Sequence, residues 1–174
     1  MKNNNIIADE TTFPLVSYQV QDLAWTFGLL IAAIIFPALL AHTPNNQWIT
    51  GTIVNAILFV AVSRVGIVNA AAIAALPSSM ALMRGLLPAP MAILIPYIIL
   101  ANILMIAIFY FISNNKLLGI ISGSILKFAF LFAITSFFIK IASPLAVMMQ
   151  WPQLFTALAG GLLALGTIKI LQKK

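Results

Sequence analysis

Long apolar runs, separated by short polar or proline-containing stretches, follow a polar segment of 22 residues at the start of the chain. A membrane-spanning helix needs about 20 mostly apolar residues, with a range of about 17–25. The pattern predicts six such helices, at Leu23–Ala41, Trp48–Ser63, Ile67–Met83, Met91–Ser113, Leu117–Ile139 and Leu154–Leu171. The division between the second and third depends on Arg64-Val65-Gly66 alone, where we expect a tight hairpin turn.

The composition agrees with a membrane protein. The 174 residues are 63% hydrophobic and 7% charged, with a mean hydropathy of +1.11, whereas soluble domains carry about 25% charged residues. The predicted fold is therefore an all-α integral membrane protein, a compact bundle of six transmembrane helices. Residues 1–22 form a polar N-terminal arm, residues 23–171 the membrane domain in the lipid bilayer, and residues 172–174 a basic tail.

The side chains available exclude several kinds of chemistry. The chain has no cysteine, one histidine and three acidic residues, Asp9, Glu10 and Asp22. The chain therefore has too few suitable residues for a thiolate or His/carboxylate metal site or for a Ser-His-Asp triad. We expect no metal, no cofactor and no enzymatic activity. The net charge of +6 reflects membrane topology rather than a nucleic-acid partner.

Basic residues predict the orientation. With six spans both termini lie on one side, and six basic residues fall there: Lys2, Arg64, Lys116, Lys169, Lys173 and Lys174. Only Arg84 and Lys140 fall on the opposite side. The positive-inside rule then predicts a multi-pass protein of the plasma membrane with both termini cytoplasmic.

Polar and aromatic residues gather at the predicted external end. Three loops meet there, at His42–Gln47, Arg84–Pro90 and Lys140–Gln153. We predict a small-molecule site at this end because polar groups converge on an otherwise apolar bundle. Its predicted residues are Asn46, Trp48, Arg84 and Trp151 around the rim and Asn55 and Asn102 at the floor. The alternative is a set of ordinary interfacial loops with a tryptophan belt.

Lys127 lies near the middle of the fifth predicted helix. A charge at that depth costs about 2.5–3.5 kcal/mol on insertion scales, and intramembrane ionisable residues usually have a function. No acidic residue lies in any predicted span, so Lys127 must be neutral, bond to backbone and amide groups, or meet an anionic ligand. It would alternatively face a watery crevice or join two helices. Ser124 stands three residues earlier, so a Ser–Lys nucleophilic pair is a further alternative.

The chain as a whole resembles the substrate-binding S component of an energy-coupling factor (ECF) transporter. The likeness rests on six short helices, little mass outside the membrane and a basic tail, together with several short sequence segments. These segments are Asn46-Gln47-Trp48-Ile49-Thr50-Gly51, Leu87-Pro88, and Trp151-Pro152-Gln153-Leu154 followed by Ala159-Gly160-Gly161. Similar chains are sometimes labelled iron hydrogenase, which the absence of cysteine excludes because the cluster needs thiolate ligands.

The resemblance implies capture of a vitamin-like molecule from the external side. It also implies an ABC-type importer, in which this chain docks onto a transmembrane coupling subunit and cytosolic ATPases through small residues of its first helix. The nearest counterparts here are Gly28, Ala32 and Ala33, and Pro37 departs from the family's Ala-xxx-Ala pattern. Two other functions stay open, a structural or assembly subunit without a ligand and an intramembrane Ser–Lys hydrolase.

Overall fold

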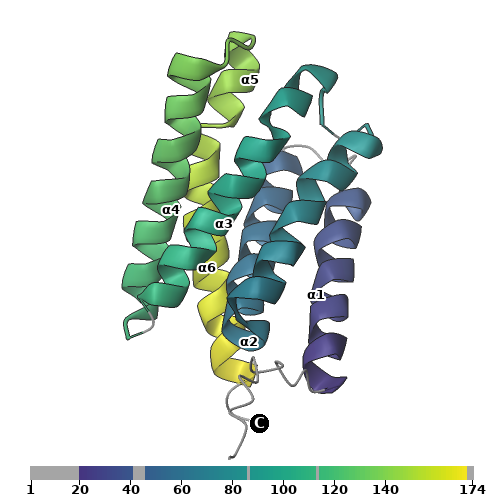
Figure 1. Ribbon diagram of the computed structural model, residues 1–174, viewed down its shortest axis with the longest axis vertical. Helices are drawn as coiled ribbons and strands as arrows, with labels where there is room; N and C mark the ends of the chain where they lie inside the picture. Colours follow the sequence, from purple (N-terminus) through teal and green to yellow (C-terminus); the bar gives the residue numbers. More distant parts are fainter. Residues whose placement is uncertain (1–19, 41–45, 86, 113, 172–174) are drawn as a thin grey trace, which may run out of the picture.

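The computed structural model describes residues 20–40, 46–85, 87–112 and 114–171, and within these ranges it is almost entirely helical, with no strand. The predicted arm up to residue 19, residues 41–45 of the first loop and the tail from residue 172 lie outside the described residues. In chain order the elements are α1 (Val20–Leu39), α2 (Asn46–Met83), η1 (Ala89–Leu94), α3 (Ile95–Phe111), α4 (Lys116–Ala133), η2 (Ile134–Phe138), α5 (Ser143–Met148) and α6 (Trp151–Leu171) (Figure 1). Five helical stretches of this part of the chain are long and apolar enough to cross a membrane.

Two predicted boundaries need correction. Helix α1 begins at Val20, so the last three residues assigned to the polar arm are helical, with Asp22 in the first turn, where a negative charge is favourable. The segment expected to be a loop over Lys140–Gln153 contains α5 and the first turn of α6. A proline in the first turn of each helix is tolerated because the amide there has no intrahelical acceptor.

Helix α2 reverses direction at Gly66. The predicted second and third runs are two helices joined directly at Gly66 within the 38 residues of α2. Gly66 has φ 77° and ψ 174°, a backbone region that is essentially restricted to glycine. In a straight helix, Thr50 and Ser78 would stand about 42 Å apart at 1.5 Å per residue. Both instead line one cavity, so the two halves of α2 lie against a common space. The ribbon shows α2 doubling back on itself (Figure 1).

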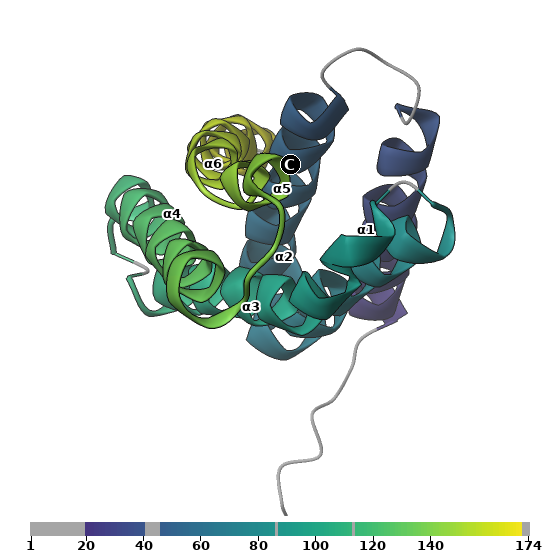
Figure 2. The same ribbon diagram turned by 90° about the horizontal axis from the view of Figure 1, so that it is seen from above.

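The helices form a single bundle in which α2 is central. Helix α2 packs against α1, α3 and α6, and α4 packs against α3 and α6. Helix α1 lies at one edge of the bundle and packs mainly on α2 (Figure 2). Five of its seven large exposed apolar side chains recur every four residues, at Leu23, Phe27, Ile31, Ile35 and Leu39, which is the spacing of neighbours on a helix surface.

Apolar packing fills the end of the bundle near Gly66. Phe59 and Phe109 meet there edge to face with ring centroids 5.0 Å apart, inside a buried cluster that draws on α1, α2, α3, α4 and α6. A smaller cluster joins η1, α3, α4 and the α5–α6 connection, around Met91, Leu131 and Met149. The opposite end of the bundle is therefore less completely packed against its central helices.

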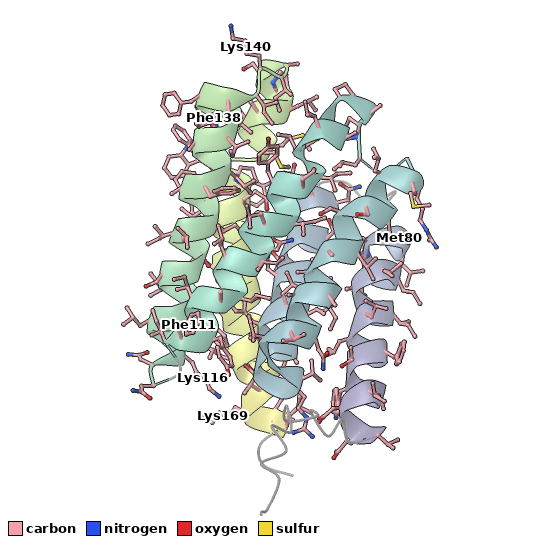
Figure 3. All side chains as sticks on the ribbon, viewed as in Figure 1. Met80, Phe111, Lys116, Phe138, Lys140 and Lys169 are labelled. Atoms are coloured by element: carbon pink, nitrogen blue, oxygen red, sulfur yellow. The ribbon has the colours of Figure 1, made fainter. Side chains whose placement is uncertain are left out.

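Basic side chains lie at both ends of the bundle. Lys116 and Lys169 lie at the end that carries the described C-terminal residues, and Lys140 lies at the other end (Figure 3). Arg64 also lies near the reversal of α2, where its guanidinium stacks 5.2 Å from the ring centre of Trp25. Long apolar side chains cover the outside of the bundle between these ends (Figure 3).

Glycines let two pairs of helices approach closely, α6 with α2 and α4 with α3. A Cβ added at Gly160 of α6 would lie 2.6 Å from the carbonyl oxygen of Thr52, and one at Gly123 of α4 would lie 2.6 Å from that of Met105. Small residues permit such backbone contact between membrane helices. These contacts hold α6 against the first half of α2, and α4 against α3.

We expect Gly160→Ala to lower the free energy of unfolding by about 1–3 kcal/mol, because the added methyl group overpacks a backbone contact. Gly166→Ala on the same helix is the matched control, since nothing lies within 4 Å of its added Cβ. The control should be neutral or stabilising, because glycine is about 1 kcal/mol less favourable than alanine inside a helix. Thermal unfolding of the two purified variants measures this, and equal melting temperatures would contradict the packing described.

Candidate small-molecule site

A cavity of about 180 Å³ lies in the half of the bundle near α5 and the turn after α2. This volume counts the space open to the centres of water molecules, of which each water needs about 10–15 Å³, so the cavity has room for roughly a dozen waters. In the liquid, that number of waters occupies on the order of 400 Å³. Small-molecule sites span about 300–1,000 Å³. Its polar lining consists of Asn46, Gln47, Thr50, Asn55, Ser78, Asn102, Lys127 and Gln153. The space therefore suits a small molecule with several hydrogen-bonding groups.

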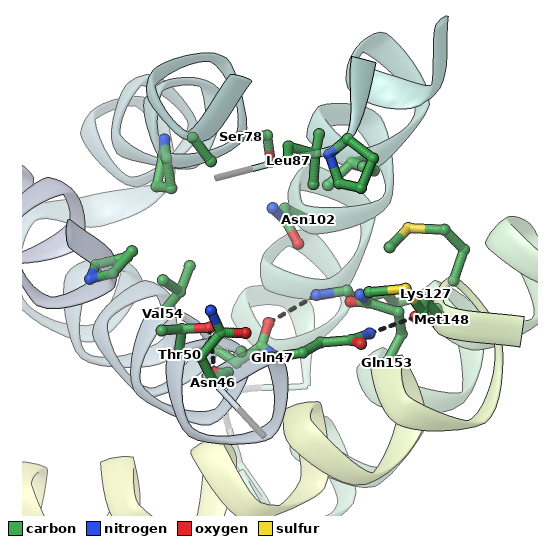
Figure 4. Close-up of a pocket in the computed structure, with 18 residues that line it drawn as sticks. Asn46, Gln47, Thr50, Val54, Ser78, Leu87, Asn102, Lys127, Met148 and Gln153 are labelled. Carbon is green, nitrogen blue, oxygen red and sulfur yellow. Dashed lines mark hydrogen bonds between the residues drawn. The ribbon is translucent and has the colours of Figure 1, made fainter. Parts of the chain in front are cut away.

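Lys127 of α4 is the charged group of this lining. Its exposed fraction is 3%, and its ammonium donates a hydrogen bond of 2.7 Å to Oδ1 of Asn55 on α2 (Figure 4). Nδ2 of Asn55 donates to Oγ1 of Thr156 at 3.4 Å, and that hydroxyl donates to the Pro152 carbonyl at 2.8 Å. A chain of polar groups thus connects α4, α2 and α6 at the cavity.

The position of Lys127 leaves it far from bulk water at either end of its helix. Eleven residues separate it from Lys116 and eleven from Phe138, which is about 16 Å in each direction at 1.5 Å per residue. Among the described residues the sole acid is Asp22, in the first turn of α1. Fifteen residues, or about 22 Å of helix, separate Asp22 from the cavity residue Pro37. Lys127 therefore has no nearby carboxylate in the described part of the chain.

Two buried side-chain oxygens in the described ranges have no hydrogen-bond partner, Oδ1 of Asn102 and Oγ of Ser124. Asn102 is 3% exposed and lines the cavity from α3, and its amide projects toward the same space as Lys127 (Figure 4). Leaving such a group unpaired costs about 1–3 kcal/mol. Ser124 is fully buried and is not part of the cavity lining.

A hydrogen bond joins α2 to α5 at one side of the cavity. Nε2 of Gln47, in the first turn of α2, donates a hydrogen bond of 2.8 Å to the carbonyl oxygen of Met148 at the end of α5. The two residues are 101 positions apart, and both line the cavity (Figure 4). The contact ties the short helix α5 to the bundle beside the polar groups.

The structure brings four of the predicted site residues together and leaves three elsewhere. Asn46, Asn55, Asn102 and Lys127 all line the cavity. The other three lie outside that lining: Trp48 and Trp151 are 44% and 54% exposed, and Arg84 is also exposed. Each tryptophan instead contacts Phe155, with ring centroids 6.3 Å and 6.5 Å away. The rim expected from these three residues is therefore absent from the described cavity.

Sequence reasoning also missed part of the lining. Pro37 and Pro77 interrupt α1 and α2 beside the cavity, and each removes an amide donor from its helix. Met148, Met149 and Gln153 contribute from α5 and α6. Prolines inside apolar runs were a visible signal, whereas no pattern distinguished these methionines from those that fill the core.

The hydrolase alternative finds no support in this arrangement. The ammonium of Lys127 donates to Asn55, and no hydrogen bond joins it to Ser124, whose hydroxyl has no partner. A nucleophile and its base must lie within hydrogen-bond reach of each other and of the substrate. A second hollow near Lys116 is lined mostly by apolar and aromatic residues, and its Ser63 hydroxyl is bonded to the Phe59 carbonyl.

Comparison with known proteins assigns the chain to no family. No protein-family model matches the chain, and neither a curated protein nor a solved structure matches it at a significant level. The function must therefore be argued from the site itself.

Asn55→Ala should destabilise the protein by about 1.5–3 kcal/mol, since hydrogen bonds to charged groups contribute that much and the ammonium would lose its described partner. In a Lys127→Met background the same change should cost at least about 1 kcal/mol less, because the charge that needs the amide is gone. A double-mutant cycle on melting stability measures the difference. Strictly additive effects would show that the two side chains do not depend on each other.

Proposed function

We propose that this protein is a membrane-embedded binding subunit that captures a small molecule in the cavity around Lys127. The observation that carries the proposal is a buried ammonium and an unpartnered amide oxygen lining one space in an otherwise apolar bundle. Intramembrane charges are costly and most often serve a ligand or an ion path. Preformed cavities with a few convergent polar groups are typical of small-molecule sites.

The proposed topology has six crossings of the plasma membrane. Six segments each supply one crossing: α1, the first half of α2, the second half of α2, η1 with α3, α4 with η2, and α6. Arg64, Lys116 and Lys169 then lie on the cytoplasmic side with both termini, and Arg84 and Lys140 lie outside. The cavity is in the half that contains the α2–η1 turn and α5, so the molecule is captured from the external side.

The proposed partners are those of an ECF-type importer, a transmembrane coupling subunit and its cytosolic ATPases. Helix α1 is the candidate docking element because its apolar window is only 6% buried within the chain, against 33–39% for the others. Of the three residues predicted for docking, Ala33 is fully buried, Ala32 is partly buried and Gly28 is exposed. Contact with a coupling subunit would therefore use Gly28 and the exposed face around Phe27 and Ile31.

The topology can be tested by labelling single cysteines, because the natural chain has none. Ala142→Cys, before α5, should react with a membrane-impermeant maleimide added to intact cells. Asn114→Cys, in the exposed turn before α4, should react only after the cells are opened, because the positive-inside rule puts that turn in the cytoplasm. The reverse labelling would exclude capture from outside.

Capture can be tested by native mass spectrometry of the protein purified from its own membranes. We expect a bound small molecule, and we expect Lys127→Met to reduce its occupancy by at least roughly tenfold, since a charge-assisted hydrogen bond is lost. Lys140→Met is the matched control, because that lysine is exposed at the end of the bundle. A wild-type protein without any adduct, or equal occupancy in both variants, would contradict the proposed site.

A further inference from the structure

The hydrogen-bonding capacity of Lys127 is incompletely used. An ammonium group has three N–H donors, and Asn55 is the one hydrogen-bond partner of Lys127 among the described residues. A neutral amide oxygen leaves the positive charge uncompensated, and a buried charge is costly unless it is paired. Lys127 lines the cavity, which offers space for an opposite charge beside it.

The rest of the lining limits the charge of the molecule that fits. Lys127 is the one charged side chain in the described lining, so a cation would meet repulsion, while a dianion would leave one negative charge buried. Phosphate sites usually offer the fork of an arginine or several backbone amides at a helix N-terminus. No arginine belongs to the described lining, whereas the first turn of α2 borders it through Asn46 and Gln47. One positive charge therefore fits a single negative charge.

Asn102 supplies a second, neutral recognition group. An amide side chain carries one acceptor and two donors, and the acceptor oxygen of Asn102 lacks a partner at an exposed fraction of 3%. Figure 4 shows Asn102 and Lys127 projecting toward one space from α3 and α4. Apolar side chains, among them Val54, Ile98 and Met149, complete much of the remaining wall.

We propose that the captured molecule is a small organic monocarboxylate. Its carboxylate accepts hydrogen bonds from the ammonium of Lys127, a hydrogen-bonding group elsewhere on the molecule meets the amide of Asn102, and an apolar body fills the remaining wall. This assignment rests on the proposed capture function and adds the charge and chemical class of the ligand. A neutral amide of the same shape lacks the charge that Lys127 requires.

The test uses pairs of compounds that differ only in acid against amide. Benzoate and benzamide, nicotinate and nicotinamide, and indole-3-acetate and indole-3-acetamide are each added at millimolar concentration to the purified full-length protein. Thermal stabilisation reports binding, because a ligand of the folded state raises the melting temperature. For at least one pair the acid should bind roughly ten- to hundredfold more tightly than the amide, the range that a charge-assisted hydrogen bond provides.

Two variants identify the group responsible. Lys127→Met should abolish the preference for the acid. Asn55→Asp is nearly isosteric and gives Lys127 an internal counter-charge, so it should also abolish the preference even if Lys127→Met fails to fold. Lys140→Met should leave the preference unchanged, because Lys140 is exposed at the end of the bundle.

Each outcome bears on a distinct claim. An acid preference that both site variants remove supports the monocarboxylate assignment. Equal or tighter binding of an amide overturns that assignment but leaves small-molecule capture standing. Stabilisation by none of the acids overturns it as well, and capture then depends separately on the adduct seen by native mass spectrometry. A preference that survives Asn55→Asp would place the anion away from Lys127 and would also overturn the assignment.

Discussion

The need to accommodate one buried ammonium in an apolar bundle explains most of the local structure around the cavity. Lys127 is too far from either end of its helix to reach bulk water easily, and no described acid lies near it. Its charge therefore requires polar groups from neighbouring helices. Asn55 supplies the direct contact, Thr156 orients the Asn55 amide, and the cavity provides access for a further partner.

Backbone features place these polar groups within reach of one another. The reversal at Gly66 returns α2 to the cavity, so that both Thr50 and Ser78 line it. Gly160 and Gly123 allow helix contacts that a larger side chain would prevent. The end near Gly66 is filled by apolar side chains such as Phe59 and Phe109, so close packing there accompanies a polar cavity in the other half.

The sequence predicted the helices and the floor of the cavity better than it predicted the rim. Long apolar runs are unambiguous, and a glycine two residues after Arg64 marked the reversal at Gly66. Lys127, Asn55 and Asn102 stood out because polar residues are rare within such runs, whatever direction they face. Trp48 and Trp151 lie outside the described cavity lining. The sequence did not show this because α2 and α6 are apolar on nearly every side, so periodicity does not reveal which face is inside. Helix α5 was missed because six residues are too few to produce a periodic pattern.

The most direct measurement is the chemical accessibility of two buried positions that differ in whether they line the cavity. Asn102→Cys and Ser124→Cys would each be the single cysteine of the chain, at sites with exposed fractions of 3% and 0%. A small charged thiol reagent added from outside should modify Asn102→Cys and should leave Ser124→Cys unmodified. Unreactive cysteines at both positions, or reaction of Asn102→Cys only from the cytoplasmic side, would contradict an externally accessible binding cavity.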